Sequence, residues 1–423
     1  MNLSEINTFI YLSLKFIYLK IIKKICDKYR CKMLKTYKFR LYPNNEQEQK
    51  LLWIMQQCKF VYNLMLEKLK EEDKQDRFEL QNKLPKLKEQ HPHLKGVYSK
   101  ILQYETYRLF SNLKALSELR KRGRKVGKLR FKSLAGFKAI HYNQSGFKII
   151  ETCSRCNRLN LSKVGDIPIR MHREFDGKIK QVVIKRFSSG RWFASINVEE
   201  DIVIQKQPIK RVVGIDMGIT EFLTDTSGKI IESPSYLKKS LKKVKLRQRG
   251  LSRTMDKSNN RKKQIFRVAK LHERVGNQRM DFCHKVAKHY VDSFDFISVE
   301  NLNIKGMIET IGEENISKGA KHHMRRNIFD VSWKKFFDVL FYKAEWAGKT
   351  SVKVNPCYTS QIQKYGKSLD RDYNASLNIL ERGLEQVGQG LSKFTPLEIV
   401  PPPELNVVLA STVVELGSRF QNH

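Results

Sequence analysis

The sequence has few acidic residues for its size, and this shortage is its strongest global feature. The 423 residues include 43 Asp and Glu against 81 Lys and Arg, which gives a formal net charge of +38. Solubility of a small domain needs a net charge of only about 2 to 8. The excess therefore indicates a polyanionic partner, and nucleic acid is the first candidate. Because basic residues run through the whole chain and do not concentrate on one amphipathic helix, a membrane-surface protein is disfavoured.

A long uninterrupted apolar segment is also lacking. The most hydrophobic stretch, "INTFIYLSLKFIYLKIIKKI", is interrupted by Lys15 and Lys20, short of the roughly 18 residues of a spanning helix. It has neither the basic start nor the small-residue cleavage site of a signal peptide. An interfacial helix remains open, but we favour Met33 as the functional start. Residues 1–32 are then an extension outside the fold, and no stable membrane association is expected.

Cysteines are few and are not paired in the sequence. Seven are scattered along the chain, an odd number that forms no disulfide framework and suits a reducing compartment. We therefore expect a cytoplasmic protein associated with the nucleoid. The pair in "CSRC", Cys153 and Cys156, has the spacing of zinc ligands, but no second pair lies nearby, and structural zinc requires four ligands. Zinc is expected to be absent or partial.

The N-terminal half changes its hydrophobic period twice. Residues Thr36 to Leu41 alternate as a strand, and helical spacing follows from Glu46. From about Gly136 the period returns to two, with turn signals at Asp176-Gly177 and at Ser188-Ser189-Gly190. We expect a β-barrel formed by residues 33–45 and 136–206, with a helical bundle of residues 46–135 inserted in it.

Two segments carry dense positive charge. "RKRGRKVGKLRF" indicates a flexible loop that contacts phosphates, or a solvated linker. A helical zone from Leu237 to Val291 has sixteen Lys and Arg between Lys238 and Arg279, and it indicates either a helix along a phosphate backbone or a solvated face. The candidate contacts in the two segments are Arg124, Lys125, Lys128, Arg130, Lys242, Lys243, Arg247, Arg261, Lys262 and Lys263.

Three acidic residues lie at the ends of apolar strands or at the start of a helix, where a carboxylate needs a partner or a function. Asp216 ends the apolar run "VVGID", Glu300 ends "FISVE", and Asp372 lies in the first turn of a helix in "DRDYNASLNIL". Strand carboxyl ends are where α/β sheets bind ligands, although an Asp in a first turn is also favoured by the helix dipole. Three carboxylates without His or thiolate partners suit Mg²⁺ or Mn²⁺. Two such ions can support phosphodiester cleavage.

These segments resemble a known family. "VVGIDMGITEFLT", "ISVENLNIKGM" and "DRDYNASLNIL" are similar to the three RuvC motifs of TnpB-like transposon-encoded nucleases, relatives of the type V CRISPR effectors. "YKFRLYPNNEQ", "YNQSGFKI", "LNLSKVGDIPIRMHR" and "NPCYTSQ" extend the resemblance over residues 35–385.

The resemblance implies an α/β fold. It combines an RNase H-like (RuvC) nuclease domain, at residues 207–385, with the β-barrel and its inserted helical bundle, and leaves an irregular tail at residues 386–423. It also implies a guide RNA and target DNA as partners, and a catalytic, metal-binding set of Asp216, Glu300 and Asp372, with Asp370 as the alternative to Asp372. Tyr37 and Arg40 become candidates for nucleic-acid contact, or else belong to the core.

The chain departs from this family where a zinc ribbon is usual. Between the second and third nuclease motifs only Cys357 is present, and the sequence is shortened near residues 362–366. Two functions therefore stay open: an RNA-guided, metal-dependent DNA endonuclease, and a non-cleaving guide-dependent binder or decayed transposon product. A strand-transfer transposase is disfavoured because no Tyr or Ser nucleophile motif stands out. The guide, the target-adjacent motif and the oligomeric state do not follow from the sequence.

Overall fold

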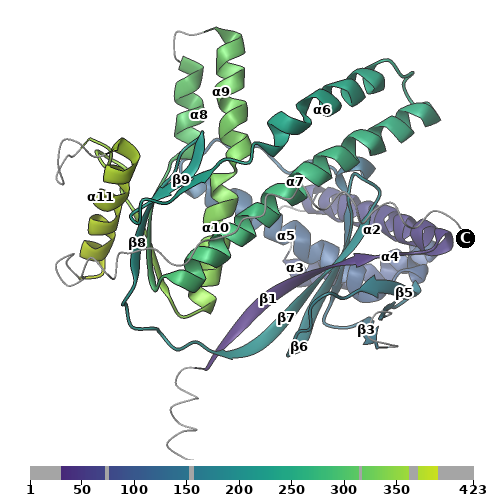
Figure 1. The fold of residues 1–423 in the computed structure, drawn as a ribbon. Helices are drawn as coiled ribbons and strands as arrows, with labels where there is room; N and C mark the ends of the chain where they lie inside the picture. Colours follow the sequence, from purple (N-terminus) through teal and green to yellow (C-terminus); the bar gives the residue numbers. More distant parts are fainter. Residues whose placement is uncertain (1–29, 72–75, 152–156, 314–316, 362–369, 389–423) are drawn as a thin grey trace, which may run out of the picture. The chain divides into compact units, whose positions relative to one another are not determined.

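Two compact units make up the chain in the computed structural model, which describes residues 30–71, 76–151, 157–313, 317–361 and 370–388. The first unit comprises the described residues up to Val203 together with Thr254–Lys270. The second comprises Ile204–Arg253 together with the described residues from Leu271 onward (Figure 1). Among the described residues, no helix has the length and hydropathy of a membrane-crossing segment.

The first unit is built on a seven-stranded antiparallel sheet in the order β2-β6-β7-β1-β5-β4-β3. Its strands are β1 (Arg30–Leu41), β2 (Ala139–Asn143), β3 (Phe147–Ile150), β4 (Arg158–Leu161), β5 (Gly165–Arg170), β6 (Lys178–Arg186) and β7 (Trp192–Val203). The edge strands β2 and β3 are joined by residues 144–146, where Gln144 and Gly146 have positive φ. No ladder joins these two described strands, so the expected barrel is a near-closed sheet.

Two expectations about this sheet are wrong. The strand expected over Thr36 to Leu41 begins earlier, at Arg30, because its first residues pair with the end of β7 from Arg30 opposite Val203. Asp176-Gly177 does not close a hairpin, because β5 pairs with β1 and β4 whereas β6 pairs with β2 and β7. The second turn signal, at Ser188-Ser189-Gly190, does join the antiparallel strands β6 and β7.

Helices occupy the sequence between β1 and β2. They are α2 (Asn45–Glu71), α3 (Arg77–Asn82), α4 (Leu84–Gln90) and α5 (Ser99–Lys121), with short 3-10 turns η1 (Pro92–Gly96) and η2 (Leu134–Gly136). The helical repeat of α2 buries Leu51, Ile54 and Cys58 in the same hydrophobic cluster as Ile140 of β2 and Ile196 of β7. Sheet and helices therefore share one core, and the boundary between a β domain and a helical domain remains a prediction.

The second unit contains a five-stranded mixed sheet in the order β10-β9-β8-β11-β12. Its strands are β8 (Val212–Asp216), β9 (Glu221–Asp225), β10 (Ile230–Glu232), β11 (Phe296–Glu300) and β12 (Thr350–Val354). Strands β8, β11 and β12 run parallel, and β9 and β10 are antiparallel to their neighbours. The apolar runs "VVGID" and "FISVE" form β8 and β11 as expected, whereas β12 was not expected.

The described helices after β10 are α6 (Tyr236–Ser252), α7 (Asn259–Ser293), α8 (Ile304–Glu313), α9 (Lys318–Val331), α10 (Trp333–Trp346) and α11 (Arg371–Gln386). The basic helical zone is thus two helices, because residues 253–258 form a turn before α7 begins. Residues 259–270 of α7 group with the first unit.

Candidate active site

Residue alternation along β8 and β11 places two acidic side chains on the same face of the second sheet. Val213, Ile215, Ile297 and Val299 pack into the cluster that holds α7 and α10, whereas Val212 and Phe296 pack with Leu380 and Leu384 of α11. Because side chains alternate in a strand, Asp216 and Glu300 fall on the α11 face. The two strands are parallel with Ile215 opposite Val299, so the next residues, Asp216 and Glu300, are neighbours.

Small residues allow α11 to lie directly on this face. A Cβ on Gly214 would come within 2.2 Å of the Ser376 carbonyl oxygen, and a Cβ on Gly383 within 2.3 Å of Ser298 Oγ. Ser298 also donates a 2.8 Å hydrogen bond to the carbonyl of Ile379. The first turn of α11, which carries Asp372, is thereby held at the sheet face that presents the other two acids.

Asp370 and Asp372 have different roles in this helix. Asp370 is the N-cap, and its Oδ1 accepts hydrogen bonds from the backbone amides of Asp372 (3.0 Å) and Tyr373 (3.1 Å). Such a cap satisfies amides that have no partner within the helix. The charge of Asp372 contributes to the raised pKa of Asp216.

Electrostatic coupling indicates that the three acids lie near one another. Burial raises the pKa of Asp216 to about 7, and the negative charges of Glu300 and Asp372 contribute to that rise, against the opposing effect of Arg371. Like charges within one site disfavour ionisation. As the side chains stand, no group of three or more His, Cys, Asp or Glu among the described residues is arranged to hold a metal ion.

A buried hydrogen-bond chain fixes Glu300. The Thr359 hydroxyl donates to Glu300 Oε1 at 2.5 Å, and Asn378 Nδ2 donates to the Thr359 carbonyl at 2.8 Å. Burial raises the pKa of Glu300, while the Thr359 hydrogen bond and the charge of Arg382 oppose that rise. Arg382 also donates to the carbonyls of Asn355 (2.9 Å) and Cys357 (2.6 Å).

Sequence reasoning missed Thr359, Asn378 and Arg382. Thr359 lies in the segment "NPCYTSQ", whose resemblance to the family marked it but gave it no chemical role. Asn378 is buried one helical turn after Asn374. A polar residue buried on the inner face of an amphipathic helix was the available signal, since buried polar groups need partners.

The side chains predicted to contact nucleic acid differ in the contacts that they already make within the protein. Tyr37 donates to Glu200 at 2.6 Å, and burial together with that carboxylate raises its pKa to about 12. The Arg40 guanidinium lies 5.1 Å from the Phe193 ring centroid and 5.4 Å from that of Tyr42. Both side chains are half-buried, and their contact with nucleic acid stays a prediction.

The lysines and arginines of the two basic segments are mostly exposed. Arg124, Lys125, Lys128 and Arg130 are exposed in residues 124–133, which form neither helix nor strand. This segment is fixed at its end by Asn63, whose side chain accepts from the Lys132 amide (2.8 Å) and donates to the Lys132 carbonyl (3.1 Å). Lys242, Lys243 and Arg247 on α6, and Lys262 and Lys263 on α7, are exposed as well.

Arg261 differs from these residues because it is half-buried. It pairs with Asp256 at 3.1 Å and donates to the Thr254 carbonyl at 3.2 Å. Cys153 and Cys156, and residues 362–369 at the shortened ribbon, lie outside the described residues. Of the described cysteines, Cys58 and Cys283 are buried and Cys357 is exposed.

The mixed sheet, its covering helix and the acidic face define an α/β protein. Three family models match the chain: "Probable transposase" (OrfB_IS605) over residues 195–310, "Helix-turn-helix domain" (HTH_OrfB_IS605) over residues 33–77, and "Cas12f1-like, TNB domain" over residues 333–379. The first match includes Asp216 and Glu300, and the third includes Asp372. In the structure, residues 33–71 of the second match are strand β1 and the single helix α2.

The chain is also similar to curated proteins. The chain is 29% identical over 347 residues to "Putative RNA-guided DNA endonuclease InsQ" of Escherichia coli (strain K12), covering 79% of this chain and 83% of that protein. It is also 29% identical over 253 residues to "Putative RNA-guided DNA endonuclease" of Streptomyces pristinaespiralis, covering 54% of this chain and 60% of that protein.

A solved structure titled "Cryo-EM structure of the Cas12f1-sgRNA-target DNA complex" aligns with a TM-score of 0.46 at 12% identity, covering 82% of this chain and 98% of that one. The family models and the curated relatives support a TnpB-like protein that is related to the type V effectors.

Proposed function

We propose that the chain is a transposon-associated RNA-guided DNA endonuclease in which Asp216, Glu300 and Asp372 bind two Mg²⁺ or Mn²⁺ ions and cleave phosphodiester bonds. The observation that carries the proposal is the placement of Asp216 and Glu300 at adjacent strand ends on the face covered by the helix of Asp372. The activity printed in the names of the two relatives supports it.

The donor set fits hard divalent cations. Three carboxylates supply oxygen ligands only, which Mg²⁺ and Mn²⁺ favour, and each carboxylate raises the cost of ionising its neighbours. Bound ions would offset that repulsion; they also activate water and stabilise the leaving oxygen in two-metal sites. The proposal requires the three side chains to turn toward a common point from their present backbone positions.

The surrounding residues position the acids. Thr359 fixes one oxygen of Glu300, while the Asp370 cap sets the start of α11 and hence the position of Asp372. Arg382 and Arg371 lower the electrostatic cost of keeping Glu300 and Asp216 ionised, respectively.

The partners we propose are a guide RNA and its target DNA. In RNA-guided recognition the pairing of strands reads the sequence, and the protein holds the heteroduplex by its shape and backbone. That mode explains a charge of +38 spread along the chain. The exposed lysines and arginines of residues 124–130, α6 and the start of α7 are the proposed phosphate contacts.

A non-cleaving guide-dependent binder is the second candidate. One observation favours it: between the second and third nuclease motifs the sequence keeps Cys357 as its single cysteine, too few for the four-ligand structural zinc site that the family usually has there. Such a protein would bind RNA and DNA through the same basic surfaces and would leave the DNA intact.

Cleavage in the presence and absence of a divalent ion separates the two candidates. We expect purified protein with its co-transcribed RNA to cut matching DNA in Mg²⁺ or Mn²⁺ and not in EDTA. Asp216→Ala should abolish cleavage, because it removes a ligand of the ions that would activate the attacking water, while DNA binding changes little. Asp281→Ala, at an exposed position on α7, is the matched control and should cut normally. Cutting by Asp216→Ala refutes the site, and binding without cutting by the wild type supports the second candidate.

A further inference from the structure

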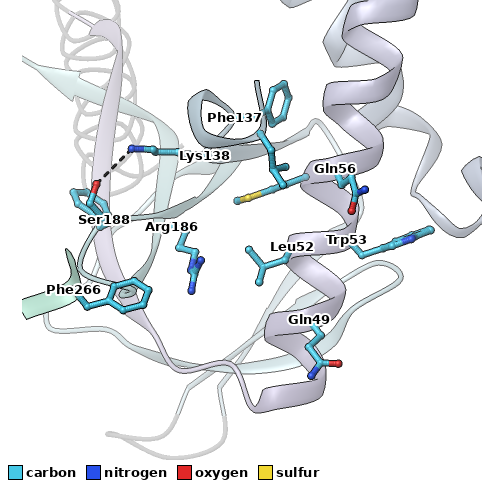
Figure 2. A pocket seen from close by; sticks show the side chains of 12 residues that line it. Gln49, Leu52, Trp53, Gln56, Phe137, Lys138, Arg186, Ser188 and Phe266 are labelled. Carbon is cyan, nitrogen blue, oxygen red and sulfur yellow. Dashed lines mark hydrogen bonds between the residues drawn. The ribbon is translucent and has the colours of Figure 1, made fainter. Parts of the chain in front are cut away.

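A cavity of about 620 Å³ lies within the first unit, whereas the three acids belong to the second (Figure 2). It is bordered by the first half of α2, by η2 and the residues after it, by the β6–β7 hairpin and by Phe266 of α7. Its volume is in the range of pockets that take small ligands or parts of larger ones. Its polar and aromatic lining includes Gln49, Trp53, Gln56, Lys138, Arg186 and Phe266.

Arg186 gives this cavity a planar cation. Its guanidinium lies between Phe266 and Leu52 in Figure 2, with its centre 5.8 Å from the Phe266 ring centroid. One Nη of Arg186 is paired with Glu48 at 2.9 Å, while its Nε is buried and has no hydrogen-bond partner among the described residues. A buried N–H donor without a partner favours the binding of a ligand that supplies a hydrogen-bond acceptor.

The α2 side of the cavity adds aromatic and amide groups. Gln49, Trp53 and Gln56 are spaced by four and three residues, so they share one face of the helix. Both glutamines are exposed, and each amide offers a donor and an acceptor. Across the cavity, Lys138 Nζ lies 3.4 Å from Ser188 Oγ (Figure 2), and it adds a second positive charge at the border.

We propose that this cavity binds one unpaired nucleobase of a single-stranded nucleic acid. Unstacked bases in protein complexes stack on aromatic rings or on Arg guanidinium planes, and their edges hydrogen-bond to side chains. Phe266 and Arg186 provide the stacking surfaces, Gln49 and Gln56 the edge contacts, and Lys138 a contact for the neighbouring phosphate. The two cations favour this occupant over an apolar peptide side chain, which would leave Arg186 Nε without a partner.

The proposal rests on the nucleic-acid-binding part of the proposed function and not on cleavage. RNA and DNA strands carry the same base chemistry, so the experiment uses both. Octanucleotides of RNA with 4-thiouridine and of DNA with 4-thiothymidine are irradiated with the full-length protein in EDTA, and the crosslinked peptides are mapped by mass spectrometry. We expect crosslinks at residues 49–56, 186–188 or 266, and the strand that gives them identifies the source.

Two variants test the assignment of the stacking groups. Phe266→Ala should lower the pocket crosslink at least about fivefold, the lower end of the loss of one base–ring stack, with total binding changed less than about twofold because phosphate contacts dominate affinity. Arg186→Lys keeps the positive charge but removes the planar guanidinium, so it should also lower the yield of the pocket crosslink. It tests the assignment even if Phe266→Ala folds poorly.

The matched control is Phe78→Ala. Phe78 is an exposed ring of the same unit, with the Arg77 guanidinium centre 4.5 Å from its centroid, but it does not line the cavity. Its loss should leave the pocket crosslink unchanged. The proposal is overturned if neither strand crosslinks in the pocket, or if Arg186→Lys leaves the crosslink yield intact. If the protein crosslinks in the cavity but does not cleave DNA, the proposed nuclease activity is refuted and the proposed nucleobase site stands.

Discussion

At the scale of single residues, Asp370 and Asp372 show how two neighbouring carboxylates take different parts. We predict that Asp370→Ala costs about 1 kcal/mol of unfolding free energy, because it removes an N-cap, while cleavage persists. Asp372→Ala should abolish cleavage with little change in stability, because it removes one of three repelling charges. Urea unfolding and Mg²⁺-dependent cleavage of both variants measure this. Loss of cleavage in Asp370→Ala with retention in Asp372→Ala would reverse the assignment.

A second residue-scale feature is a carboxylate inside the core of the first unit. Glu105 on α5 is fully buried, and its carboxylate lies 3.5 Å from an Arg108 Nη. Burial raises its pKa from 4.5 to about 7, against the charges of Arg108 and Lys132. Burial lowers the pKa of His141 to about 4, so His141 stays neutral while Glu105 titrates. The folded state therefore holds the Glu105 proton more tightly than the unfolded state does.

The sign of the resulting pH dependence follows by linkage. The stabilising contribution of neutral Glu105 is complete below about pH 4.5 and is lost as the pH rises to about 7. Glu105→Gln removes this titration, so it should be more stable than the wild type at pH 8 by up to about 3 kcal/mol and similar to it at pH 4.5. Urea unfolding at both pH values measures the difference. An equal offset at the two pH values would contradict the prediction.

At the scale of elements, the contact between α11 and the second sheet is the critical one. A Cβ at Gly214 meets backbone of α11, with Ser376 O at 2.2 Å and Leu380 N at 2.8 Å, so no side-chain rotation relieves the clash. We predict that Gly214→Ala destabilises the protein by about 1–3 kcal/mol or more and lowers cleavage by displacing Asp372.

Gly276→Ala provides the control for that substitution. Gly276 lies on α7, and a Cβ added there would meet no atom within 4 Å among the described residues. Alanine in a helix is favoured over glycine by about 1 kcal/mol. This variant should be as stable as the wild type or more so, and should cut DNA normally. Thermal unfolding and cleavage of the pair measure both effects, and equal behaviour of the two variants would show that α11 tolerates displacement.

At the scale of the whole molecule, the charge sets how binding depends on salt. Each phosphate neutralised by Lys or Arg releases counterions, and six to ten contacts lower affinity by about 10³- to 10⁵-fold between 50 and 200 mM salt. With exposed cations on residues 124–130, α6 and α7, we predict a loss of at least about 10³-fold for the RNA complex over that range. Filter binding at several salt concentrations measures it. A loss below tenfold would mean that few of these cations contact phosphate.

Local sequence and composition were enough to predict the strands and the helix that carry the acids, and the class of partner that the charge requires. A buried strand is specified by an apolar run such as "FISVE" with an acid at its end, and α11 begins at a capping Asp beside its own first turn. Net charge is a sum over residues and needs no fold. These features can be predicted without coordinates because neighbouring residues or composition specify them.

Only the folded structure shows which of these elements pair or pack together. The pairing of β5 with β1, the near-closed sheet and the place of β12 depend on residues distant in the chain, and strand pairing carries little local signal. The same holds for Thr359 on Glu300, and for Phe266 beside Arg186. Each of these two contacts joins residues 59 or more positions apart. Packing selects such partners because it is the assembled core, and not the local pattern, that brings their backbones together.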